Sequence, residues 1–306
     1  MPRSPLVLAA LATAAVAGLR PVATRPGAVS GNEFDVAVVT DDQGRLWTVR
    51  APRRAAAGAL LESELQLLAA LRDAGRVSLP FAVPEPAGTA PLPEGGRCVV
   101  YPYLPGSPLH PGDLTPGPGL AAALGRALAA LHDAPRSIAD DAGLPVYEAD
   151  EYRDRRMSEL DRSAATGSVP ARLLGRWERA LEDVGRWKFQ PCLVHGDLVA
   201  EHVLVTDGDV AGMLSWSKAR VADPADDLAW VAVGADEAAL DSVLESYAIT
   251  RADPPDRHLA FRARLAGELA LARWLLHGVR LDDAAVVDDA AQMLRDLAAD
   301  VGEERL

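Results

Sequence analysis

The chain has 306 residues, which is more than one typical domain and too few for three. Apolar residues make up 49% and charged residues 25%, the ordinary mix of a globular protein, so the composition excludes a disordered or collagen-like chain. The formal net charge of −13 disfavours binding to duplex DNA through phosphate contacts and favours cationic or neutral ligands, so we expect no nucleic-acid partner.

An apolar, alanine-rich run occupies residues 6–19, after a positive charge at Arg3. This arrangement is similar to the start of a secretory signal peptide. The run contains more alanine than leucine and is too short to span a bilayer, so we interpret it as the first helix of a soluble protein. Cys98 and Cys192 are too few for a disulfide scaffold, and no other segment has membrane-spanning length. We therefore expect a cytoplasmic protein without a membrane partner.

Strands and one helix are predicted in the first third of the chain. Residues 34–50 have the pattern of two strands joined by a polar turn at 41–44. Residues 55–74 carry leucines at helical spacing, and a short apolar strand follows at 97–103. A loop rich in proline and glycine, residues 105–119, then indicates a boundary between two lobes.

Helices dominate the rest of the chain, beginning with the apolar run at 120–133. The exceptions are short apolar strands at 192–194 and 202–214. Within the second of these, a turn at 207–209 leads to a strand that we expect to end at Trp216.

The order of these elements indicates the fold class. Strands concentrate before residue 105 and helices after it, which is typical of an α+β protein. We expect a small β-rich N-terminal lobe over residues 1–104 and a larger, mainly helical C-terminal lobe over 105–306.

The most informative stretch for chemistry is residues 193–230. An apolar strand there ends in His195, Gly196 and Asp197, and His202 follows five positions after the aspartate. Polar side chains at the ends of short buried strands form a rigid platform for catalysis. With this spacing Asp197 can hold a substrate hydroxyl while His202 faces a metal. The alternative is an ordinary loop with a solvated aspartate.

Three motifs in this stretch carry a resemblance to a known family. The chain reads HGDLVAEH, LSW and DPADDLA, and it resembles the aminoglycoside phosphotransferase and choline kinase family, whose motifs are HGDxxxxN, an IDW-type metal motif and DPxxDLA. The histidine that ends the first motif is similar to the HGDLxxxH loop of the macrolide 2'-phosphotransferases. This resemblance implies a protein-kinase-like fold of two lobes, with nucleotide bound by residues 1–104 and the catalytic loop and acceptor pocket in 105–306.

The resemblance also implies roles for the polar residues of the loop. Asp197 matches the catalytic base that accepts the proton of the attacked hydroxyl, and His202 matches the position that reaches magnesium. His195 would orient the loop by hydrogen bonding, with a purely structural histidine as the alternative. We interpret Asp223 and Asp227 as structural: Asp223 ties the loop, and Asp227 caps the following helix.

Arg50 ends the strand LWTVR, at the place where kinases have a lysine that grips phosphate. Residues 1–104 contain no lysine, so any cation that clamps phosphates there must be an arginine. A guanidinium group suits phosphate oxygens because it donates two parallel hydrogen bonds. Its expected partner is Glu64, or else Glu62, on the next helix, although all three are also compatible with surface charges.

The resemblance assigns the rest of the nucleotide site to the strand at 97–103. Val100, Tyr101 and Tyr103 match the hinge between the lobes, whose backbone would hydrogen-bond the purine of ATP or GTP. A buried apolar strand has much the same sequence. The segment Ser30-Gly31-Asn32 is a weak candidate for a glycine-rich phosphate loop.

Ser215 is the main departure from the family pattern, because it stands where the IDW motif has the aspartate that holds magnesium. Magnesium prefers anionic oxygen ligands, and a serine hydroxyl lacks the charge. We expect this loss to cost about 10²–10⁴ in rate. Glu201 is the one nearby carboxylate that could help, since Asp207 and Asp209 belong to the turn.

The resemblance therefore implies that Mg²⁺-bound GTP or ATP donates its γ-phosphoryl group to a hydroxyl of a small molecule. The acceptor would be a macrolide-like cation, phosphorylated at the 2'-hydroxyl of its amino sugar. One alternative is a degenerate member that binds nucleotide or ligand with little transfer, which Ser215 favours. Another is a kinase-like fold kept as a scaffold.

Overall fold

The computed structural model of the protein describes residues 2–27, 33–74 and 79–301. The phosphate-loop candidate Ser30-Gly31-Asn32 lies outside these residues. The chain forms two compact units, each assembled from separate segments. The first comprises Met1–His110, Pro135–Leu144 and Val199–Ala219, and the second comprises Pro111–Ala134, Pro145–Leu198 and Arg220–Leu306. The predicted C-terminal lobe thus contributes segments to both units.

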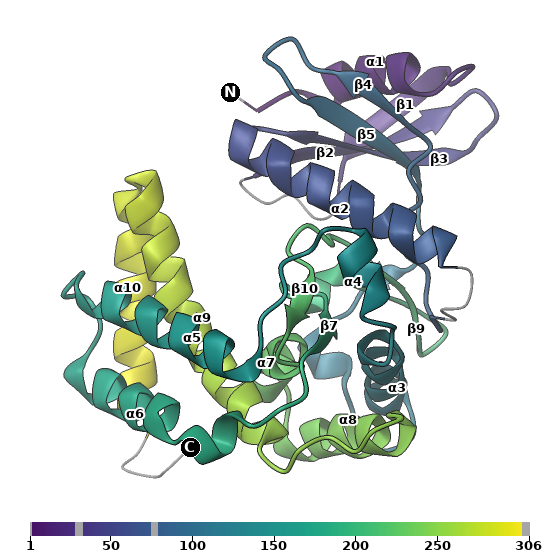
Figure 1. Ribbon diagram of the computed structural model, residues 1–306. Coiled ribbons are helices and arrows are strands. Elements are labelled where there is room, and N and C mark those ends of the chain that lie inside the picture. The colour runs from purple at the N-terminus through teal and green to yellow at the C-terminus, as the bar shows by residue number, and fades with distance from the viewer. Residues whose placement is uncertain (1, 28–32, 75–78, 302–306) are drawn as a thin grey trace. The chain divides into compact units, whose positions relative to one another are not determined.

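The first unit is built on a five-stranded antiparallel sheet (Figure 1). Its strands, in spatial order, are β1 (Pro21–Pro26), β2 (Phe34–Asp41), β3 (Leu46–Pro52), β5 (Arg97–Pro102) and β4 (Gly88–Pro91). Helix α1 (Pro5–Ala15) packs Leu8 and Ala12 against Val39, Val49 and Val100 on one face of the sheet. Helix α2 (Ala55–Asp73) contacts β3 and then the short α4 (Ser137–Asp141). The predicted first helix, strand pair, second helix and hinge strand are all present.

The turn between β2 and β3 is held by the buried carboxylate of Asp41. Its Oδ1 accepts from the backbone N–H groups of Gln43 and Arg45, at 3.0 and 2.8 Å, and its Oδ2 accepts from Trp47 Nε1 at 3.0 Å. Burial acts to raise the pKa of Asp41, but these hydrogen bonds outweigh it and lower the pKa to about 2. One side chain therefore fixes the polar turn predicted at 41–44.

A second sheet in the first unit contains β6 (Ser107–Pro108), β8 (Val203–Thr206) and β9 (Asp209–Met213). The β8–β9 turn residues Asp207 and Gly208 have φ of 53° and 80°, as a tight two-residue hairpin turn requires. The prediction that this strand ends at Trp216 was wrong. β9 ends at Met213, because the left-handed backbone of Ser215, with φ of 67°, interrupts the extended chain. The Trp216 indole then donates to the Met213 carbonyl at 2.9 Å.

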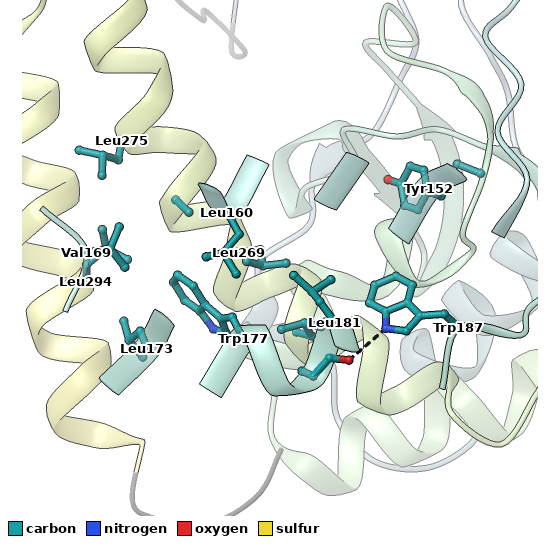
Figure 2. Close-up of a cluster of buried hydrophobic side chains, with 14 of the residues drawn as sticks. Tyr152, Leu160, Val169, Leu173, Trp177, Leu181, Trp187, Leu269, Leu275 and Leu294 are labelled. Carbon is teal, nitrogen blue, oxygen red and sulfur yellow. Dashed lines mark hydrogen bonds between the residues drawn. The ribbon is translucent and has the colours of Figure 1, made fainter. Parts of the chain in front are cut away.

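The second unit is mainly helical. Its longer helices are α3 (Leu120–His132), α5 (Ala149–Ala164), α6 (Ala171–Glu182), α7 (Ala225–Gly234), α8 (Glu237–Thr250), α9 (Leu259–Leu281) and α10 (Ala284–Asp300). One hydrophobic core joins α5, α6, α9 and α10 (Figure 2). Within it the Trp177 indole donates to Glu268 at 2.7 Å and the Trp187 indole to the Ala180 carbonyl at 3.0 Å, so both buried N–H groups are satisfied. Within the described ranges, no helix combines the length and apolarity needed to cross a membrane.

A short antiparallel sheet is embedded among these helices. It pairs β7 (Cys192–Val194) with β10 (Arg220–Ala222), and Val194 lies opposite Arg220. The loop that contains Asp197 begins directly after β7. The chain therefore leaves a rigid, hydrogen-bonded strand at the point where the sequence predicts chemistry.

Helices α3 and α8 approach closely at Gly125. A Cβ atom on this residue would lie 2.4 Å from the Val243 carbonyl oxygen and 2.9 Å from the Tyr247 nitrogen. Both contacts are with backbone, which cannot rotate away as a side chain can. In α6, by contrast, a Cβ on Gly175 would meet only the end of the Arg179 side chain, at 3.4 Å.

These two glycines should respond in opposite directions to alanine. We expect Gly125→Ala to lower the free energy of unfolding by about 1–3 kcal/mol, because the two helices must move apart. The matched control Gly175→Ala should raise it by about 0.5–1 kcal/mol, because alanine is the better helix former. Urea unfolding followed by circular dichroism measures both, and equal effects would contradict the close approach of α3 and α8.

Candidate active site

The centre of the candidate site is the loop that follows β7, residues 195–197. His195 is completely buried, and Gly196 has a φ of 79°, a left-handed conformation that glycine adopts without steric cost. This turn changes the direction of the chain immediately before Asp197. The ring of His195 takes part, since its Nδ1 accepts from the Asp197 backbone N–H at 3.4 Å. The loop-orienting contact expected of His195 is therefore present.

A second carboxylate, Asp227 in the first turn of α7, holds this loop from inside the protein. Its Oδ2 accepts from the His195 backbone N–H at 2.7 Å, and its Oδ1 accepts from the Gly196 N–H at 2.8 Å. His132 Nε2 lies 3.1 Å from the same carboxylate, and the other ring nitrogen of His132 lies 2.8 Å from the Tyr247 hydroxyl. All three side chains are buried, so the hydrogen bonds are shielded from water.

The roles predicted for Asp223 and Asp227 were wrong, and the structure reverses them. Asp227 ties the loop, whereas Asp223 Oδ1 accepts from the Ala225 N–H at 3.0 Å at the start of α7. Asp223 also forms a buried ion pair with Arg262, with Nε 2.7 Å from Oδ2. Burial raises the pKa of Asp223, and Arg262 opposes that rise. The reversal arises because Asp227 lies inside the helix, one turn past the position where a side chain can cap it.

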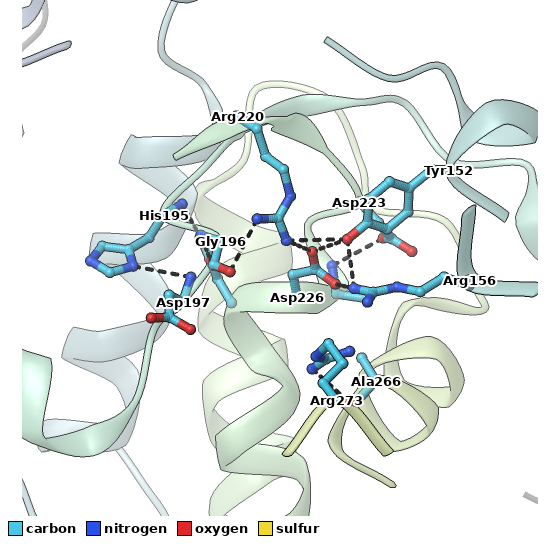
Figure 3. A network of polar contacts seen from close by, with 12 residues as sticks. Tyr152, Arg156, His195, Gly196, Asp197, Arg220, Asp223, Asp226, Ala266 and Arg273 are labelled. Atoms are coloured by element: carbon cyan, nitrogen blue, oxygen red, sulfur yellow. Dashed lines mark hydrogen bonds and ion pairs between the residues drawn. The ribbon is translucent and has the colours of Figure 1, made fainter. Parts of the chain in front are cut away.

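Asp226, the neighbour of Asp227, is the centre of a buried polar network (Figure 3). Its Oδ1 accepts from Arg156 at 2.7 Å, its Oδ2 accepts from Arg220 at 2.5 Å, and the Tyr152 hydroxyl donates to it. Burial acts to raise the pKa of Asp226, but the charges of Arg156 and Arg220 outweigh it and hold that pKa well below its usual range. Burial also raises the pKa of Tyr152, so its hydroxyl stays protonated.

The first unit holds the other group of predicted residues. Arg50 Nη1 lies 2.5 Å from Glu64 Oε2, both side chains are buried, and the guanidinium carbon lies 3.9 Å from the centre of the Phe34 ring. The Tyr101 hydroxyl donates to Glu64 Oε1 at 3.4 Å. The partner of Arg50 is thus Glu64. Glu62 instead pairs with Arg97 on the surface.

The hinge strand uses part of its backbone inside the sheet. The Val100 carbonyl accepts from the Ala87 N–H at 2.8 Å, and the Tyr103 N–H donates to the Leu46 carbonyl at 2.9 Å. The side chain of Tyr103 lies under the guanidinium of Arg25, 6.0 Å from ring centre to Cζ. These two backbone groups are therefore committed to the protein rather than left for a purine.

His202 and Ser215, the predicted metal ligands, are brought close in the first unit by a backbone hydrogen bond. The Leu214 N–H donates to the His202 carbonyl at 2.9 Å, which places Ser215 next to the 3₁₀ turn η3 (Ala200–His202). Among the described residues, no three or more His, Cys, Asp or Glu side chains gather where they could hold a metal ion. An imidazole and a neutral hydroxyl do not fit the hard, anionic oxygen set that magnesium prefers.

Sequence reasoning missed several residues that shape the site. His132, Arg156 and Arg220 each contact a carboxylate of α7 or a residue bound to it, yet none lies within the HGDLVAEH, LSW or DPADDLA motif. Charged residues in amphipathic helices are ordinarily solvated, so the pattern gives no signal that Arg156 is buried. The one available signal is that Asp226 and Asp227 are adjacent at the start of an otherwise apolar helix, where unpaired burial is costly.

Replacing Asp227 tests the hydrogen bonds that hold the loop. We expect Asp227→Asn to lower the free energy of unfolding by about 2–3 kcal/mol, because a neutral amide cannot accept from both loop N–H groups as a carboxylate does. Asp241→Asn, on the exposed surface of α8, is the matched control and should change stability by less than about 0.5 kcal/mol. Urea unfolding measures both variants, and similar stabilities would show that Asp227 does not fasten the loop.

Comparison with known proteins identifies the family. The model of the phosphotransferase enzyme family (APH) matches residues 25–261. The crystal structure of macrolide 2'-phosphotransferase MphH from Brachybacterium faecium has 29% sequence identity, covers 99% of this chain and 100% of that one, and superposes with a TM-score of 0.81. A macrolide 2'-phosphotransferase type I has 30% identity, with 94% and 96% coverage and a TM-score of 0.79.

Viomycin phosphotransferase from Streptomyces vinaceus is 31% identical over 193 residues, or 57% of this chain. The alignments span 63% of that protein and no more than 66% of the curated relatives that match. The near-complete superposition on MphH confirms the predicted α+β, protein-kinase-like fold. Because the family model covers well over half of the sequence, the chain belongs to the phosphotransferase enzyme family.

Proposed function

We propose that the protein transfers the γ-phosphoryl group of a nucleoside triphosphate to a hydroxyl of a small molecule. The observation that carries this proposal is the geometry of the loop at 195–197. The carboxylate of Asp227 accepts hydrogen bonds from two backbone N–H groups of this loop, and the left-handed conformation of Gly196 turns the chain just before Asp197. Phosphoryl transfer to a hydroxyl requires a base in a fixed orientation, because the reaction depends mainly on the positions of the reacting groups and on the charges around them. Membership of the phosphotransferase family supports the same reaction.

In the proposed reaction Asp197 accepts the proton of the acceptor hydroxyl. The oxygen forms a bond to the γ-phosphorus, the bond from that phosphorus to the β,γ-bridging oxygen breaks, and the nucleoside diphosphate leaves. Arg50 would hold donor phosphates, oriented by Glu64 and supported by the Phe34 ring beneath its guanidinium. This assigns the nucleotide to the lobe of residues 1–104 and the acceptor to 105–306.

The donor is a purine nucleoside triphosphate, either GTP or ATP. Family members with the same fold have been crystallised as a GDP complex of aminoglycoside 2'-phosphotransferase-IIIa and as a streptomycin–ATP complex of APH(2")-IIa. Both nucleotides are therefore compatible with the fold. The side chains of Val100, Tyr101 and Tyr103 give no reason to expect guanine rather than adenine.

The acceptor we propose is a macrolide-like cation, modified at the 2'-hydroxyl of its amino sugar in the cytoplasm. The two macrolide 2'-phosphotransferases match nearly the whole chain at 29% and 30% identity. The net charge of −13 favours a cationic ligand over a polyanion. Phosphorylation of such a compound would confer resistance to it.

The second candidate is a family member that binds nucleotide or ligand with little transfer. Ser215 favours it, because the magnesium expected to accompany the donor finds no carboxylate at this position. Glu201, the nearest carboxylate in sequence, lies on the exposed side of η3.

The transfer reaction can be tested directly. The purified protein is incubated with magnesium and GTP or ATP, and with erythromycin, viomycin or gentamicin as acceptor. We expect mass spectrometry to detect a phosphorylated macrolide, and we expect Asp197→Asn to lower the rate by about 10²–10⁴ because the base is lost. Unchanged turnover in Asp197→Asn would contradict the proposed role of Asp197. Nucleotide binding without transfer to any acceptor would favour the second candidate.

Ser215→Asp tests the departure at the metal position. The left-handed backbone there suits aspartate and asparagine better than most residues, so neither should disturb the fold. We expect Ser215→Asp to raise turnover by about 10- to 100-fold, because the added carboxylate would help hold the magnesium that accompanies the donor. Ser215→Asn fits the same backbone without the charge and should leave turnover near wild type. Equal rates in the two variants would mean that charge at residue 215 does not limit transfer.

A further inference from the structure

The backbone of Gly196 is held by two side chains, Asp227 of the DPADDLA motif and Arg220, which precedes that motif. Asp227 accepts from the Gly196 N–H at 2.8 Å, and Arg220 Nη1 donates to the Gly196 carbonyl at 3.2 Å. The glycine is therefore fixed at both its N–H and its carbonyl. Since Asp197 is the next residue, the direction of its Cα–Cβ bond depends on both contacts.

Arg220 is itself oriented by a carboxylate. Its Nη2 lies 2.5 Å from Asp226 Oδ2 and 3.2 Å from the Tyr152 hydroxyl, while its Nη1 reaches the loop. The two arms of one planar guanidinium thus join two partners at a set angle. Figure 3 shows Arg220 between the His195–Asp197 loop and Asp226.

The carboxylate that orients Arg220 is also fixed. Asp226 Oδ1 accepts from Arg156 Nη2 at 2.7 Å, and Arg156 also donates to Tyr152 at 2.6 Å. At the backbone, Arg220 pairs with Val194, the last residue of β7. The side chain therefore extends from a strand beside the loop and is clamped at its charged end.

We propose that Arg220 is a positioning residue for Asp197: by holding the Gly196 carbonyl it fixes the orientation of the Asp197 carboxylate, and Asp226 fixes Arg220 in turn. The inference rests on the proposed function in which Asp197 is the base. Adjacent residues of α7 then fasten the same loop in two ways, Asp227 directly and Asp226 through an arginine. Arg220 acts through geometry, since its guanidinium joins the Gly196 carbonyl to the Asp226 carboxylate.

Lysine at this position separates geometry from charge. The ammonium group of Arg220→Lys is a single point and cannot bind Asp226 and the Gly196 carbonyl with two separate arms. We expect kcat to fall by about 10- to 100-fold, since a small misplacement of a reacting group has an effect of that size, and KM for both substrates to stay within about twofold. Asp226→Asn should have a similar but smaller effect, because Arg220 loses its anchor.

Two comparisons distinguish positioning from general structural damage. Arg153→Lys, on the same helix as Arg156 and paired with its neighbour Asp154, is the matched control and should leave kcat unchanged. In an Asp197→Asn background, Arg220→Lys should cause no further loss, because the group it positions is gone. A further loss of the same 10- to 100-fold there would overturn the proposal.

Hydrogen–deuterium exchange gives a readout that needs no substrate. We expect Arg220→Lys to speed amide exchange in residues 195–198 at least tenfold, while exchange in α3 and in Arg153→Lys stays at the wild-type rate. Unchanged exchange at 195–198 would overturn the proposal whatever the activity. Faster exchange in a protein that transfers no phosphoryl group would contradict the proposed function and leave the fastening of the loop by Arg220 intact.

Discussion

The buried carboxylate of Asp227 is the constraint on which the candidate site depends. The loop after β7 has two backbone N–H groups, those of His195 and Gly196, that point into the protein at 2.7 and 2.8 Å from this carboxylate. A buried N–H without an acceptor is costly, so the loop can take this path only where Asp227 receives it. The side chain of His132 completes the arrangement from α3. Helices α3 and α7 of the second unit are thereby linked to the loop at residues 195–197.

Adjacent residues of one helix turn divide this work because their side chains leave the helix about 100° apart. Asp227 points to the loop amides, and Asp226 points to the arginines of α5 and β10. One carboxylate accepts from backbone directly, whereas the other sets the direction of a guanidinium that donates to backbone. In the first unit the Arg50–Glu64 pair has the same form, since a buried carboxylate orients the guanidinium group that we propose holds the donor phosphates.

Much of the fold follows from local sequence pattern, and the limits have physical reasons. The β2–β3 hairpin and α2 were predictable because alternation and helical spacing are local signals, and Asp197 was recognisable from its motif. The short strands β1, β4 and β10 were missed, because proline-containing or three-residue strands carry almost no periodicity. The contacts of Arg156 with Asp226 and of Arg220 with Tyr152 could not be predicted, because they join segments about 70 residues apart through side chains that are ordinarily exposed. The roles of Asp223 and Asp227 depend on where α7 begins. If the start of α7 is predicted one turn too late, the two aspartates exchange their roles.

The choice of arginine at residue 50 has a consequence for chemical labelling. Lys188 and Lys218 are the only lysines in the sequence, and both lie on exposed positions outside the five-stranded sheet. Amine-directed reagents, including acylating nucleotide analogues that mark phosphate-gripping lysines, would therefore reach lysine at two surface positions and leave the Arg50–Glu64 pair untouched. Guanidine-directed dicarbonyl reagents would be the appropriate probes of this lobe, with nucleotide protection of Arg50 as the signal.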